Sequence, residues 1–110
     1  MRYFVVASLL LFISGATLGN EAHDIINGMS DAQRNQALAM FMQRSGEACS
    51  NVTRNFYQGS DRSGNAFWNI TCSNGKSWSV MIFNDSKGST KILECSVMKA
   101  VGGGQCFKKF

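Results

Sequence analysis

The segment 66–82, AFWNITCSNGKSWSVMI, decides the fold because it contains two strands of alternating character around a short turn. Its large apolar residues recur at every second position, which is typical of strands with one buried face. A two-residue Asn-Gly loop would place the two apolar sets on opposite faces of the hairpin. A three-residue loop over 73–75 pairs Trp68 with Val80 and leaves both sets on one face. Because a slip of one residue turns every side chain over, burial favours the three-residue loop.

The flanking segments extend this hairpin into a larger sheet. Alternation begins near Val52, a turn-forming run occupies 61–65, and a second turn at 84–88 precedes a further strand at 90–95. Upstream, apolar residues at helical spacing and a Ser-x-x-Gln capping box predict a helix over 31–45. The expected fold class is α+β, with one N-terminal helix packed on a four-stranded antiparallel β-meander.

One face of this sheet should form the core beneath the helix. Leu93 and Cys95 of the last strand should point the same way, with Glu94 in solvent. The other core positions on this face are Val52, Phe56, Trp68, Ile70, Trp78, Val80 and Ile82.

The opposite face, called the outer face below, is the candidate binding surface. It should carry an apolar row within a polar, mostly uncharged surround, which is typical of a protein-binding patch. One alternative stays open: the C-terminal segment, with Val97, Val101, Phe107 and Phe110, folds back and covers the row. The predicted partner-binding residues are Tyr57, Phe67, Met81 and Phe83.

Four cysteines predict a disulfide framework in an exported chain. Antiparallel pairing brings the start of the first strand beside the end of the second, which predicts a Cys49–Cys72 disulfide. A short glycine-rich link joins the remaining two, which predicts Cys95–Cys106. No CxxC spacing occurs, so the sequence predicts neither a thioredoxin-like redox pair nor a zinc knuckle.

The N-terminus has the pattern of a secretory signal peptide, with a cationic start, a short apolar run and small residues. Cleavage is expected after Gly19, with a cut after Ala22 as the weaker alternative. The predicted organisation is a signal peptide at 1–19, a flexible N-terminal arm at 20–29 and a single small α+β domain at 30–110, with a short helical turn as the alternative for 20–29. We expect a periplasmic or secreted protein that does not insert into a membrane after signal removal.

No residue pattern indicates catalysis, a metal or a cofactor. His23 is the single histidine, and we expect it in solvent on the predicted arm, where a general base would be poorly placed. If processing left Glu21 as the first residue, the amino terminus, two amides and His23 would suit Cu(II), but the preceding residues fit such a cut poorly. The carboxylates are dispersed, without the paired spacing of an acid–base site. We therefore expect no catalytic residue, no metal ligand and no cofactor.

Charge and composition narrow the class of function. The chain has 11 Lys and Arg against 7 Asp and Glu, and the basic residues are scattered, which argues against nucleic-acid binding. We expect a small non-catalytic binding module, or an accessory subunit of an envelope complex, that binds a protein partner through the outer face. The alternatives are a small secreted hydrolase and a cationic surface-active or antimicrobial protein. The dispersed acidic residues and missing ordered histidine count against the hydrolase, and the modest net charge counts against the cationic protein.

Overall fold

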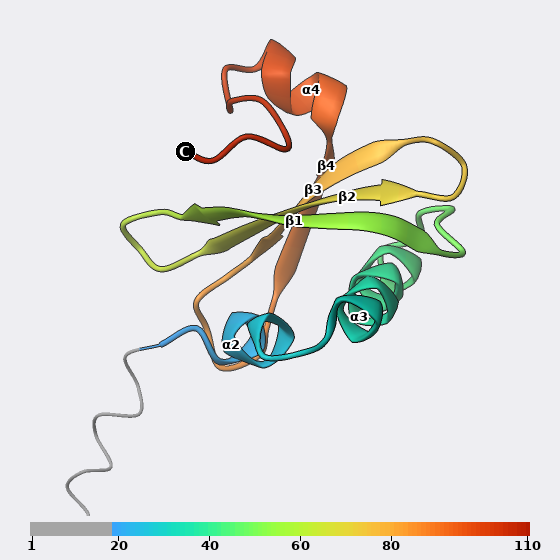
Figure 1. Cartoon of the computed structure of the whole chain (residues 1–110). Coiled ribbons are helices and arrows are strands. Elements are labelled where there is room, and N and C mark those ends of the chain that lie inside the picture. The colour runs from blue at the N-terminus through green and yellow to red at the C-terminus, as the bar shows by residue number, and fades with distance from the viewer. Residues whose placement is uncertain (1–18) are drawn as a thin grey trace, which may run out of the picture.

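The central hairpin lies in the middle of a four-stranded antiparallel sheet with the order β1-β2-β3-β4. The computed structural model describes residues 19–110 and confirms the predicted α+β meander (Figure 1). The predicted signal peptide therefore lies outside the described residues, apart from Gly19. The strands are β1 (Val52–Ser60), β2 (Ala66–Cys72), β3 (Ser77–Ile82) and β4 (Thr90–Glu94).

The predicted register of the hairpin is confirmed. Trp68 pairs with Val80 and Ile70 pairs with Trp78, and Gly75 in the loop has a φ of 89°. Glycine adopts this left-handed conformation without the steric cost that a side chain would add. Ile70 and Val80 are completely buried, and full burial of each such side chain stabilises the fold by about 1.5–3 kcal/mol.

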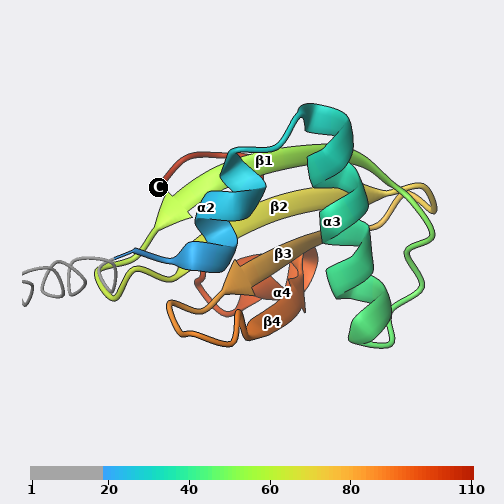
Figure 2. The ribbon, with the colours of Figure 1, turned by 90° about the horizontal axis from the view of Figure 1, so that it is seen from below.

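Helix α3 (Asp31–Arg44) covers the inner face of the sheet. Its capping box is present as predicted: Gln33 N donates to Ser30 Oγ, and Ser30 N donates to Gln33 Oε1. Leu38 and Met42 point into the core and are completely buried. Figure 2 shows α3 beside a second, shorter helix, with both helices crossing the strands.

The second helix, α2 (Glu21–Asn27), replaces the flexible arm expected over 20–29. Asn20 caps it by accepting a hydrogen bond from His23 N, and its Nδ2 donates to the carbonyl oxygens of Gly64 and Ile82. His23 and Ile26 lie three positions apart and are both buried. The correction has a physical cause: an Asn cap starts the helix, and these two side chains give it one face to bury.

Strand β1 contains two bulges, and they change which side chains face the helices. The pairing with β2 shifts between Val52 and Arg54 and again between Tyr57 and Gly59. Each bulge adds one unpaired residue, so the alternation of faces is reset at each of them. Tyr57 therefore pairs with Trp68 and joins the inner face, which is the opposite of the prediction.

Phe56 is corrected for the same reason. It pairs with Asn69, and its ring lies 6.2 Å from the ring of Phe107 on the outer face. The strand β4 also differs from expectation, because Ile92 pairs with the buried Val80 while Leu93 pairs with Ser79. Ile92 rather than Leu93 therefore belongs to the inner face.

Both predicted disulfides, Cys49–Cys72 and Cys95–Cys106, are present, and no cysteine of the described chain is free. The first joins the start of β1 to the end of β2. The second ties the start of helix α4 (Cys95–Ala100) to the C-terminal tail, defined here as residues 101–110. Figure 1 shows α4 and the tail on the side of the sheet opposite α2 and α3. Within residues 19–110, no helix has the length and apolar character that a bilayer span requires.

Candidate functional site

The predicted cross-strand pair Phe67 and Met81 marks the centre of the outer face. Both side chains are half-buried. Beside them lies a hollow of about 150 Å³, called the outer hollow below. It is bounded by the outer side chains of β2, β3 and β4 and by α4 and the start of the tail. Its lining consists of Phe67, Ser79, Met81, Lys91, Leu93, Met98 and Gly103.

The other two predicted partner-binding residues do not line the outer hollow. Tyr57 lies on the inner face, where its ring centroid is 4.6 Å from that of His23 and 5.1 Å from that of Trp68. Phe83 follows the end of β3, and its N–H donates to Ser89 O in the next turn. The structure thus brings together two of the four predicted residues.

A pair of buried amides, Gln58 and Asn69, fixes the tail to the outer face. Gln58 Nε2 donates to the carbonyl oxygens of Gln105 and Lys108 at 2.8 and 3.1 Å. Asn69 Oδ1 accepts from Phe107 N at 2.7 Å, and its Nδ2 donates to Gln58 Oε1 at 3.3 Å. Gln58 is 1% exposed and Asn69 is fully buried. Each of these hydrogen bonds therefore replaces a hydrogen bond to water that the side chain loses on burial.

Aromatic rings of the tail complete this cover over β1 and β2. The Phe110 ring meets the Phe67 ring edge-on with a centroid distance of 5.3 Å. The guanidinium carbon of Arg54 lies 3.8 Å from the centroid of the Phe107 ring. The alternative in which the C-terminal segment folds back onto the outer face is therefore confirmed for Phe107 and, through one edge-on contact of a ring that is itself 65% exposed, for Phe110. It is wrong for Val97 and Val101, for which the described chain shows no such contact and which are 43% and 69% exposed.

The sequence predicts neither Lys91, Met98 nor Gly103 at this site, and it places Leu93 on the inner face. Met98 is buried, and Gly103 packs against it so closely that a Cβ at Gly103 would lie 3.0 Å from Met98 Cγ. The alternation of β4 was the available signal, since Lys91 and Leu93 share a face in any register.

The charges of the outer face are positive. Lys91 lines the outer hollow, and Lys99 lines a neighbouring hollow of about 290 Å³ between α4 and Phe107. Lys109 Nζ lies 4.6 Å from the centroid of the Tyr57 ring at the β1 edge. No side-chain carboxylate lines either hollow.

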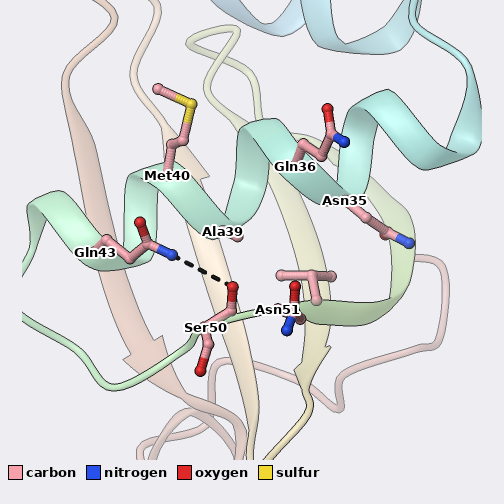
Figure 3. Close-up of a pocket in the computed structure, with 8 residues that line it drawn as sticks. Asn35, Gln36, Ala39, Met40, Gln43, Ser50 and Asn51 are labelled. Atoms are coloured by element: carbon pink, nitrogen blue, oxygen red, sulfur yellow. Dashed lines mark hydrogen bonds between the residues drawn. The ribbon is translucent and has the colours of Figure 1, made fainter.

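A larger hollow, of about 350 Å³, lies between α3 and the start of β1 (Figure 3). Amide side chains dominate its wall, and Gln43 Nε2 donates to Cys49 O at 3.1 Å. No titratable group lines this hollow, so it offers no group for proton transfer. Its lining residues are Asn35, Gln36, Ala39, Met40, Gln43, Ser50, Asn51 and Val52.

A further surface feature is an apolar groove of about 220 Å³ between α2 and α3. Ile25 and Met40 line it and are 64% and 50% exposed. Nothing in the described chain indicates what would occupy this groove.

His23 is 8% exposed, which corrects the prediction of a solvated histidine. Its Nδ1 accepts a hydrogen bond from Trp68 Nε1 at 3.0 Å, so the nitrogen that an N-terminal Cu(II) site would use is already occupied. Burial lowers the pKa of His23, and neighbouring Asp24 opposes that effect. Among residues 19–110, no three His, Cys, Asp or Glu side chains gather in a way that could hold a metal ion.

Comparison of the chain with protein-family models, with curated proteins and with solved structures finds no match in any of the three.

Proposed function

We propose that the chain is an exported, non-catalytic module that binds a protein partner through the outer hollow. The observation that carries this proposal is the open apolar hollow that Phe67 and Met81 line together with Leu93 and Met98. Apolar surfaces with a polar rim are typical of protein-binding sites.

The proposed location rests on two independent features. The sequence of 1–19 has the pattern of a signal peptide, and two disulfides link the folded domain. Disulfides persist in oxidising compartments, so both features support a periplasmic or extracellular protein.

The chemistry of the lining favours binding over catalysis. Phe67, Met81, Leu93 and Met98 offer apolar contact, and Ser79 has no histidine near it to act as a base. His23 lies on the other side of the sheet, where it is bonded to Trp68. The side chains that surround the hollow thus supply shape and charge for recognition rather than groups for proton transfer.

Site-specific photocrosslinking in intact cells of the source organism tests this proposal. A photoreactive amino acid replaces Lys91 at the hollow, and in a matched variant it replaces Lys87 in the exposed β3–β4 turn. We expect one distinct protein to be captured from position 91 and not from position 87. Leu93→Asp, in a variant whose circular dichroism shows it to be folded, should remove this product. Equal capture from both positions, or none from position 91, would contradict the proposal.

A further inference from the structure

We infer that the partner inserts one apolar side chain into the outer hollow and presents carboxylates to the lysines beside it. This inference rests on the proposed function and specifies the class of partner: an acidic polypeptide segment with a single large apolar anchor.

The volume of the hollow limits what can enter. A protein cavity of about 150 Å³ lined by apolar side chains accommodates a molecule the size of benzene. The outer hollow has the same volume, and its wall is built from Phe67, Met81, Leu93 and Met98. One aromatic or branched aliphatic side chain therefore fills it, and a flat apolar surface without a protruding side chain does not.

The wall of the hollow is fixed on two sides. The Cys95–Cys106 disulfide ties α4 to the tail, and Gly103 N donates to Met98 O at 2.8 Å. Phe67 is held from the β1 side by the edge-on ring of Phe110. A site with such support loses little conformational freedom when an anchor enters, which favours binding.

The distribution of charge on this chain determines the sign of the charge that its partner should carry. Residues 51–110 contain eight Lys and Arg and three Asp and Glu. Residues 20–50, by contrast, contain two Lys and Arg and four Asp and Glu. The excess of positive charge therefore belongs to the sheet and tail. Because complementary charges at the rim steer association and select partners, this face favours a negatively charged segment.

The three side-chain carboxylates of residues 51–110 do not neutralise the outer hollow. Asp61 and Asp85 accept hydrogen bonds from backbone N–H groups within their own turns, between β1 and β2 and between β3 and β4. Glu94 pairs with Trp78, on the register of the inner face. Lys91 at the hollow and Lys99 beside it are thus left to meet charges of the partner.

The position of the methionines allows a direct test on the folded chain. Met81 and Met98 line the outer hollow, while Met29 and Met40 line the groove between α2 and α3. With ¹³C-labelled methionine methyl groups, one NMR spectrum reports on both surfaces. The probe is a synthetic peptide with the sequence Gly-Asp-Glu-Phe-Glu-Asp-Gly, and matched peptides carry Ala for Phe or Lys for every acidic residue.

We expect the acidic phenylalanine peptide to shift the methyl signals of Met81 and Met98 and to leave those of Met29 and Met40 unchanged. Loss of the anchor in the alanine peptide should weaken binding at least about tenfold, because burial of an aromatic side chain supplies most of the affinity. Lys91→Glu with Lys99→Glu should weaken it about three- to tenfold, since exposed charges contribute modestly. Lys87→Glu, the matched control, should stay within about twofold of wild type, because the turn between β3 and β4 carries it away from the hollow.

Several results would overturn the inference. Shifts confined to Met29 and Met40 would show that the peptide binds the groove and that the site is wrong. Equal binding of the basic peptide would show that the partner is not of the acidic class. Vesicles of anionic phosphatidylglycerol provide the other test: broadening of Met81 and Met98 by vesicles, with no response to the peptide, would assign this face to a membrane surface.

The crosslinking experiment separates this inference from the proposed function. A partner captured at position 91 that binds Lys91→Glu, Lys99→Glu as tightly as wild type would refute the acidic class and leave the binding module standing. Failure to capture any protein at position 91 would refute the proposed function itself.

Discussion

Acid should weaken the attachment of α2 to the sheet, because the hydrogen bond between His23 and Trp68 exists only while the histidine is neutral. An indole N–H can only donate, so His23 Nδ1 must be the acceptor and the ring hydrogen must lie on Nε2. Protonation adds a hydrogen to Nδ1 and leaves the buried indole N–H without a partner. The groups that face this ring are Asp24 in α2, Tyr57 in β1 and Arg34 of α3, whose guanidinium carbon lies 5.5 Å from the Trp68 ring.

The sign of the effect follows from the pKa. Burial lowers the pKa of folded His23 below its ordinary value of 6.5, against the smaller opposing effect of Asp24. As the pH falls through 6.5, the unfolded chain takes up a proton that the folded chain does not, and the free energy of unfolding decreases. The decrease is at most about 1.4 kcal/mol per pH unit for one proton, and it ends once the pH is below the folded pKa. The physical cause is the indole donor, since leaving a buried donor unpaired generally costs about 1–3 kcal/mol.

Urea denaturation at pH 8, 7, 6 and 5, followed by tryptophan fluorescence without reductant, measures this effect. His23→Gln is the matched variant, since it retains an acceptor and cannot titrate. We expect wild type to lose stability between pH 7 and 5 and the variant to show a flat profile. Asp61 and Asp85 do not interfere: hydrogen bonds, chiefly from Asn65 and Ser89, lower their pKa below 3.8, so their contribution is lost only in stronger acid. Parallel pH profiles for the two proteins would refute the reasoning.

Three further changes test the rest of the framework. Gly59→Ala should displace the tail, because φ at Gly59 is 140° and the added Cβ would lie 2.8 Å from Phe110 Cδ2. Hydrogen exchange at the Phe110 N–H should then become at least about tenfold faster than in wild type. Asn69→Leu should lower the free energy of unfolding, measured by urea denaturation, by about 2–5 kcal/mol, because it leaves Gln58 Oε1 and Phe107 N–H without partners. A loss below about 1 kcal/mol would contradict the role of this amide pair. Cys49→Ser with Cys72→Ser should lower the free energy of unfolding by about 3.4 kcal/mol, and Cys95→Ser with Cys106→Ser, which opens the shorter loop, by about 2.8 kcal/mol. A larger loss for the second pair in urea denaturation would count against the loop-entropy account.

The central hairpin was predictable from sequence because both of its strands present large apolar residues at strict alternation. Only one register places Trp68 and Val80 on the same face, and any slip would expose a whole strand of apolar side chains. The Cys49–Cys72 pair followed from the antiparallel pairing of β1 with β2, and Cys95–Cys106 followed because the two remaining cysteines are close in sequence. A strong pattern on both strands of the hairpin thus determined its register, while the disulfides rested on strand order and sequence separation.

Strand β1 was less predictable because Phe56 and Tyr57 are adjacent and both aromatic. Either could face the core, and local alternation does not choose between them. The choice depends on partners far away in sequence: Phe107 receives Phe56, while His23 and Trp68 receive Tyr57. Gly59 is a local signal for the second bulge, because an isolated glycine within a strand often marks one. The first bulge, between Val52 and Arg54, has no glycine to mark it.

The same ambiguity affected the site itself. Ile92 and Leu93 are adjacent apolar residues in β4, and the sequence assigned Leu93 to the core. Pairing of Ile92 with Val80 settles the question, and Leu93 then joins the outer hollow. Two of the four predicted binding residues, Phe67 and Met81, belong to the well-determined hairpin, which explains why these two lie on the predicted face and line the hollow.

The tail has a dual effect on the outer face, and this makes the two disulfides unequal for binding. Over β1 and β2 its rings pack on Phe56 and Phe67, while over β3 and β4 it supplies Gly103 and holds Met98, so that a flat sheet face becomes concave. Loss of Cys95–Cys106 frees that wall, whereas loss of Cys49–Cys72 acts at the far end of β1 and β2. If the hollow recognises its partner by shape, Cys95→Ser with Cys106→Ser should remove the difference in affinity between the phenylalanine peptide and the alanine peptide. This loss should be seen even in protein that remains folded. Cys49→Ser with Cys72→Ser should lower stability and leave affinity within about twofold, because sites without shared contacts act independently.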